Sequence, residues 1–152
     1  MTSNQLVTLS SLGFIATPIT PMDAEDILTY KAIDDLEASL EERARSYLDL
    51  NCGYCHRAET GNRGNFDLSL NLTTEQTGLL NAGFNESLGI EDERIVYGGD
   101  AEKSILYHRM NSTDPAIRMP PLSKNVIDTP AVQLIAEWIN QLEPPSEFKI
   151  AN

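Results

Sequence analysis

Apolar residues recur at helical spacing in the middle of the chain. Residues 35–51 contain strong helix formers and neither glycine nor proline, so a helix is predicted there. The stripe expected to face the core comprises Leu40, Ala44, Tyr47, Leu48 and Asn51. This helix leads directly into a cysteine-containing motif at residues 52–56, after which a glycine- and asparagine-rich stretch predicts a loop.

Two further helices are predicted in the second half of the chain. The turn Gly98-Gly99 and the expected N-cap residue, Asp100, precede a helix predicted over about residues 101–111. The clearest helix begins at Thr129 as N-cap, with Pro130 at its first helical position, and ends before Pro144-Pro145. Its expected buried stripe comprises Val132, Ile135, Ala136, Ile139 and Leu142. The fold class is therefore expected to be all-α.

The remaining segments read as connections. Residues 1–36 are polar and punctuated by prolines, and we expect them to form an extended lead-in that wraps the domain. Residues 37–152 are then expected to form the domain itself, in a chain that is a single domain overall. The alternation of Phe66, Leu68, Leu70 and Leu72 suggests a short extended piece.

The net charge of the chain limits the classes of partner that it can bind. The 152-residue chain carries 23 acidic and 11 basic residues, a net charge of -12, which argues against nucleic acid or an anionic membrane as a binding surface. No apolar stretch approaches the ~20 residues needed to span a bilayer. No basic residue precedes Lys31, so no signal peptide is recognised, and Met1 is expected to begin a mature chain or an excised domain.

Both cysteines lie in Cys52-Gly53-Tyr54-Cys55-His56, which matches the C-x-x-C-H signature of covalent haem attachment. In this motif two thiols three residues apart bind one edge of the porphyrin, and the adjacent histidine ligates iron. A thioredoxin-like dithiol is an alternative, but it needs a helix that begins at the first cysteine, whereas here a helix is predicted before it. A zinc site completed by His56 and His108, or two chance core cysteines, are weaker alternatives.

A second axial ligand is expected downstream of the motif. Met119 lies in Arg118-Met119-Pro120-Pro121-Leu122, where two prolines stiffen a loop between helices. Met110 fits the buried face of the helix over 101–111, and His108 would serve only a bis-histidine haem, so both remain alternatives to Met119. His56 and Met119 would fill both axial positions of the iron, which favours electron transfer over catalysis. A haem enzyme or sensor with a labile distal ligand is the alternative function.

Together these residues resemble class I monohaem cytochrome c, and more closely the cytochrome c modules of multidomain secreted bacterial proteins. The resemblance is recognised in residues 42–52, residues 100–107, and residues 110–122 with the Met-Pro loop. It extends over most of the chain, including a similar lead-in at residues 5–14. It departs from the family in having no proline between His56 and Pro115 to accept the second proton of the haem histidine, and in the turn at residues 97–100.

The resemblance implies a cytochrome c fold, with three to five helices around one covalently bound haem c and its iron and with long loops. Tyr47 and Leu48 should pack against Leu134, Ile135 and Trp138, and Arg118, Pro120 and Arg57 are candidates for contact with the haem, the arginines through its propionates. It also implies a periplasmic or secreted electron carrier rather than an enzyme. Its redox partners are expected to be fused or associated domains, such as a dehydrogenase as donor or a polysaccharide-oxidising copper enzyme as acceptor.

Overall fold

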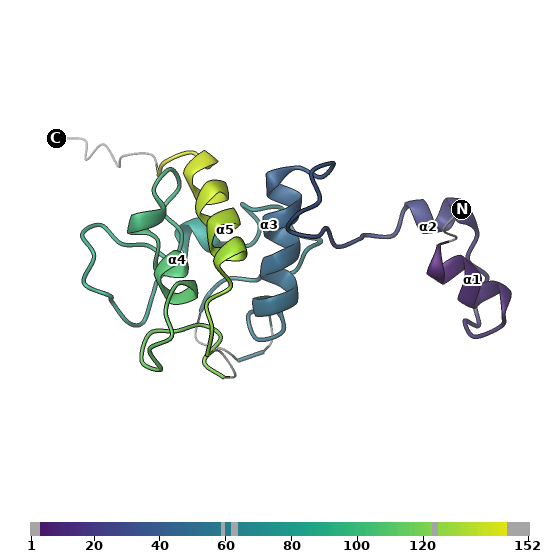
Figure 1. Ribbon diagram of the computed structural model, residues 1–152, viewed down its shortest axis with the longest axis horizontal. Helices are drawn as coiled ribbons and strands as arrows, with labels where there is room; N and C mark the ends of the chain where they lie inside the picture. Colours follow the sequence, from purple (N-terminus) through teal and green to yellow (C-terminus); the bar gives the residue numbers. More distant parts are fainter. Residues whose placement is uncertain (1–3, 59, 62–63, 123–124, 146–152) are drawn as a thin grey trace.

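The computed structural model describes residues 4–58, 60–61, 64–122 and 125–145. Within these residues the structure is helical, and its only β-type pairing is an isolated bridge between Arg94 and Ser104. Three helices, α3, α4 and α5, form the body of the domain, with α5 between the other two, while α1 and α2 lie to one side (Figure 1). The expected all-α class is confirmed for the described part of the chain. None of its helices combines the length and apolar character needed to cross a membrane.

Helix α3 spans Leu40–Leu48 and is followed by one π-helical turn, η1, at Asp49–Gly53. It begins later than predicted because Ser39 and Glu42 form a capping box: the Ser39 Oγ accepts the Glu42 N–H at 3.2 Å, and the Glu42 carboxylate accepts the Ser39 N–H at 2.8 Å. Residues before Ser39 form turns instead. The predicted helix before the cysteine motif, with a loop after it, is confirmed.

The helix predicted over 101–111 is divided in two: a 3-10 turn, η3, at Ala101–Lys103 and helix α4 at Ile105–Met110. Asp100 caps the first piece, as predicted. The break falls at Ser104, which is extended because the backbone on either side of it pairs with residues 94 and 95. Another 3-10 turn, η2, spans Leu79–Asn81.

Helix α5 spans Thr129–Gln141, close to the prediction. Its N-cap is Asp128 rather than Thr129, since the Asp128 Oδ1 accepts the Ala131 N–H at 3.2 Å. Pro130 lies in the first turn, where the lack of an N–H costs nothing.

The core is formed where α3 packs against α5. The two helices run in opposite directions, so the C-terminal end of α3 and the N-terminal end of α5 lie at the same end of the domain (Figure 1). As expected, Leu48, Ile135 and Trp138 share one buried cluster, against which Tyr47 packs; Leu134 is buried outside that cluster. The Trp138 indole N–H donates to the Glu41 carboxylate, which ties the two helices together by a polar contact as well.

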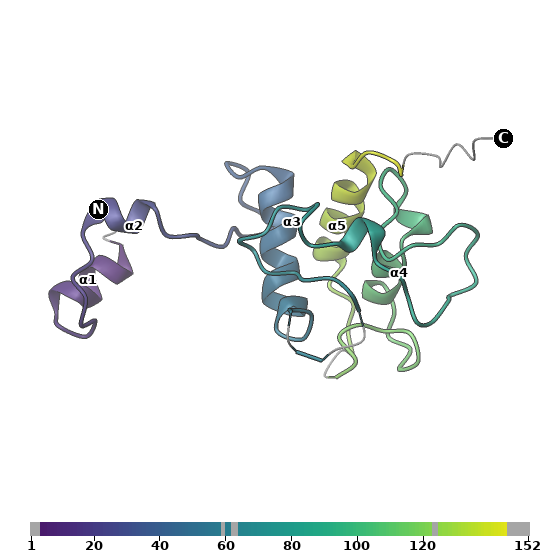
Figure 2. The same cartoon turned by 180° about the vertical axis from the view of Figure 1, so that it is seen from behind.

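The lead-in differs from the expected extended segment. It contains two short helices, α1 at Gln5–Ser11 and α2 at Pro21–Glu25, that contact each other and lie away from the body of the domain in both views (Figures 1 and 2). Among the described residues of the lead-in, the stretch after these helices contacts α3: the Lys31 N–H donates to the Ser46 hydroxyl at 2.9 Å, and Arg43 donates to the Ile33 carbonyl at 2.9 Å. The helices form because Asn4 and Thr20 cap them.

Candidate functional site

A cleft of about 420 Å³ lies at the end of the domain where α3 ends and α5 begins. This volume is in the range of small-molecule and cofactor sites. Four segments contribute its described lining: the end of α3 with η1, the end of α4, the loop after Met119, and the start of α5. The residues are Tyr47, Asn51, Cys52, Met110, Met119, Pro120, Leu122, Asn125, Val126, Asp128 and Val132. The cleft therefore joins Cys52 to Met119, which are far apart in the sequence.

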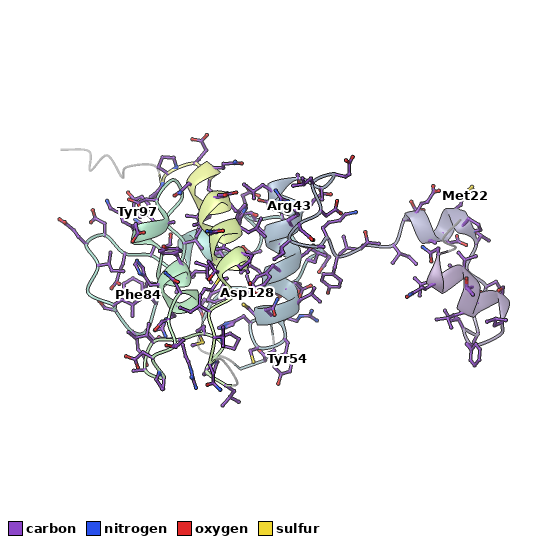
Figure 3. The ribbon with its side chains drawn as sticks, viewed as in Figure 1. Met22, Arg43, Tyr54, Phe84, Tyr97 and Asp128 are labelled. Carbon is purple, nitrogen blue, oxygen red and sulfur yellow. The ribbon has the colours of Figure 1, made fainter. Side chains whose placement is uncertain are left out.

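The cysteine motif forms a tight turn at the end of α3. The amides of Cys55 and His56 both donate to the Cys52 carbonyl, at 3.0 and 2.8 Å, and the His56 carbonyl accepts the Leu68 N–H at 2.9 Å. Cys52 and Cys55 are both partly buried, and Tyr54 between them is exposed. Figure 3 shows Tyr54 at the same end of the domain as Asp128, on the outer surface of the turn. A redox dithiol requires a helix that begins at its first cysteine, because the N-terminal end of the helix dipole stabilises the thiolate. Cys52 instead lies at the C-terminal end of a helical segment, where the dipole does not favour a thiolate.

The ring of His56 stacks on Phe66, with 4.7 Å between the ring centroids and 16° between the planes. Burial lowers the pKa of His56, which keeps the imidazole in the neutral form that ligates metals. Its Nδ1 is buried and has no hydrogen-bond partner among the described residues. The sequence has no proline between His56 and Pro115, so no proline carbonyl of that stretch is available to this atom.

The loop that carries Met119 is held to α4 by one backbone hydrogen bond and one side-chain hydrogen bond. The Met119 N–H donates to the Arg109 carbonyl at 2.9 Å, and the Arg109 guanidinium donates to the Ile117 carbonyl at 3.0 Å. Met119 is partly buried and, with the exposed Pro120, lines the cleft. A stiff proline loop thus presents a thioether to the same space as Cys52.

Met110 and His108, the two alternatives to Met119 as second ligand, occupy different places in the structure. Met110 lines the cleft but also belongs to the buried cluster between the helices, as expected for a core residue. His108 is outside the cleft lining, and its Nε2–H donates to the Glu102 carbonyl at 2.8 Å. No three His, Cys, Asp or Glu side chains of the described residues come together as a metal site.

The structure does not bring all of the predicted residues to the cleft. Cys55, His56 and Arg118 are outside its described lining, although the first two belong to the same turn as Cys52. The Arg118 Nε donates to the Pro121 carbonyl at 3.3 Å, so this guanidinium braces its own loop. Arg57 donates to Asp49 at 2.6 Å.

The sequence did not reveal the polar contacts that three residues of this region make: Tyr47, Asp128 and Asp49. Tyr47, predicted only as a core residue, lines the cleft, and its hydroxyl donates to the Asp128 Oδ2 at 3.3 Å. Burial and the Asp128 charge raise the pKa of Tyr47, so it remains a protonated donor.

Asp49 is buried behind the cysteine motif. Burial alone would raise its pKa, but hydrogen bonds from Arg57, Tyr30 and the Leu70 amide outweigh burial and hold that pKa below its usual value. An acidic residue next to the apolar stripe was the available sequence signal for Asp49.

Comparisons of the chain with protein-family models, with curated proteins and with solved structures found no match. The chemistry of the site therefore rests on its own residues. Two observations are compatible with a haem: the cleft volume suits a cofactor, and Cys52 lines the same space as Met119, whose thioether is a known ligand of haem iron. His56, which would supply the imidazole, belongs to the same turn as Cys52 but is outside the described cleft lining.

Proposed function

We propose that this chain is a monohaem c-type cytochrome that carries single electrons. The observation that supports this most directly is the shared cleft: the first cysteine of a C-x-x-C-H motif and a methionine from a distant proline loop line one cofactor-sized space. Cys52 and Met119 are far apart in the sequence, so only folding brings the two residues to one space.

Each residue has a distinct role in this proposal. Cys52 and Cys55 would hold the haem covalently, His56 and Met119 would ligate its iron, and Pro120 would stiffen the loop that carries Met119. When bound, haem c supplies a one-electron iron couple. The chain's own residues keep His56 neutral, hold the backbone of Met119 to α4, and line the cleft with a mainly apolar surface. An iron ligated by both His56 and Met119 would favour electron transfer over reaction with oxygen or peroxide.

The proposal extends to fold and setting. The helical domain would adopt the cytochrome c fold and work in the periplasm or outside the cell, where c-type haem is attached. Its redox partners would be fused or associated domains, for example a dehydrogenase as donor or a polysaccharide-oxidising copper enzyme as acceptor. The net charge of -12 favours partners with a basic docking face.

The first test is whether the mature protein contains covalent haem. We expect a mass equal to the chain plus one haem and no reactive thiols at Cys52 and Cys55. A mass without haem together with two reactive thiols would refute the cytochrome and support the dithiol alternative.

The second test identifies the axial methionine with a matched pair of variants, Met119→Leu and Met110→Leu, which remove a thioether at nearly constant volume. The ferric protein should show the weak red absorption band of an iron–thioether bond, and this band should be lost in Met119→Leu and kept in Met110→Leu. The opposite result would assign the ligand to Met110. A wild-type protein that contains haem but lacks the band would instead favour the haem enzyme or sensor with a labile distal ligand.

A further inference from the structure

The carboxylate of Asp49 connects four segments behind the cysteine motif. Its side chain is only 3% exposed, its Oδ1 accepts from Arg57 at 2.6 Å, and its Oδ2 accepts from the Tyr30 hydroxyl at 2.9 Å and from the Leu70 amide at 3.1 Å. Asp49 begins the π-helical turn that contains Cys52, and Arg57 directly follows His56. The Asp49–Arg57 salt bridge therefore joins the two ends of the motif.

Gly53, inside the motif, lies directly beneath this salt bridge. A Cβ atom at Gly53 would collide with the Asp49 Oδ1 and would lie 3.3 Å from the Asp49 Cγ and 3.6 Å from the Arg57 Nε. The backbone of the turn can approach the carboxylate only because residue 53 has no side chain. This contact gives a local reason for glycine at one of the two variable positions of C-x-x-C-H.

The salt bridge also differs from the other ion pairs of the domain in its burial. The Lys103–Asp92 pair, for comparison, is 3.8 Å long with the Asp92 side chain 71% exposed, a situation in which ion pairs contribute almost nothing. Asp49 is buried and accepts three hydrogen bonds, so loss of Arg57 would leave part of a buried charge unsatisfied, although Arg57 itself is 47% exposed.

We propose that Asp49 and Arg57 are positioning residues for the cysteine motif: their salt bridge, closed over Gly53, holds the turn in which the amides of Cys55 and His56 bond to the Cys52 carbonyl. The two cysteines and His56 are thereby kept in one fixed register. The proposal that the salt bridge holds the turn rests on these contacts alone. The proposal that the held turn serves haem attachment also rests on the proposed function.

Amide hydrogen exchange at Cys55 and His56 in the isolated full chain tests the salt bridge. Three variants break the salt bridge by different routes. Asp49→Asn removes the anion and Arg57→Gln removes the cation. Gly53→Ala introduces a steric clash without a change of charge. We expect exchange at both amides to accelerate by roughly tenfold in each variant, relative to the core amides of α5, which report global unfolding. The matched control, Asp92→Asn, removes an exposed carboxylate from an ion pair and should leave both rates unchanged.

The outcomes separate the two proposals. If exchange at Cys55 and His56 changes only as much as exchange in α5, the salt bridge has a general stabilising role and the positioning proposal is refuted. Arg57→Gln keeps this test decisive if Asp49→Asn does not fold, because Arg57 is half exposed. If the wild-type mass shows no haem, the proposed function fails while the exchange comparison still decides whether the turn is held. If haem is present, we expect a lower yield of haem-loaded chain for all three variants and an unchanged yield for Asp92→Asn.

Discussion

Replacing Leu48 by alanine tests the contact between α3 and α5 that holds the cysteine motif against the rest of the domain. Leu48 is 0% exposed and belongs to the buried cluster with Ile135 and Trp138. Because the other members of this cluster are themselves buried and limit collapse of the cavity, we expect the free energy of unfolding to fall by about 3–5 kcal/mol. With a urea dependence typical of a domain of this size, the midpoint should move down by about 2 M.

Leu50 provides a control of the same chemistry two residues away. Its side chain is 58% exposed, so Leu50→Ala should change the free energy of unfolding by less than about 0.5 kcal/mol. Urea denaturation of both variants, followed by far-UV circular dichroism, measures the difference. Equal losses for the two variants would mean that α3 presents a different face to α5, and the reasoning about the core would be refuted.

Three further predictions concern single contacts and one boundary. Asp128→Ala should lower stability by about 0.5–2 kcal/mol in denaturant titration, because α5 loses its N-cap; no loss would exclude that role. The stability advantage of the wild type over Asp49→Asn should be full above about pH 4 and shrink below it, because the pKa of Asp49 is lower in the folded than in the unfolded state; a constant advantage from pH 3 to 7 would contradict this. Deleting residues 1–26 should leave the unfolding midpoint within a few degrees of the full chain in calorimetry, since α1 and α2 contact each other rather than the domain body; a large decrease would show that they stabilise it.

The helices could be predicted because their signals are local. The spacing of apolar residues identified α3 and α5, and proline placed the start of α5 to within one residue. Some errors concerned local signals, since the caps at Asn4, Thr20 and Ser39 set the starts of α1, α2 and α3. Another error arose where tertiary contacts override local preference. Ser104 interrupts a helix of suitable composition because the neighbouring backbone pairs with residues 94 and 95, which no local pattern reveals.

The sequence by itself determined the chemistry available to this protein: a C-x-x-C-H motif after a helix, one methionine in a proline loop, and an acidic surface charge. The tertiary structure decided which of these residues meet. The cleft shared by Cys52 and Met119, and the buried Asp49 that joins the two ends of the motif, depend on contacts between segments distant in sequence. Such contacts form only when the chain buries its helical stripes together, so they follow from packing rather than from any local pattern.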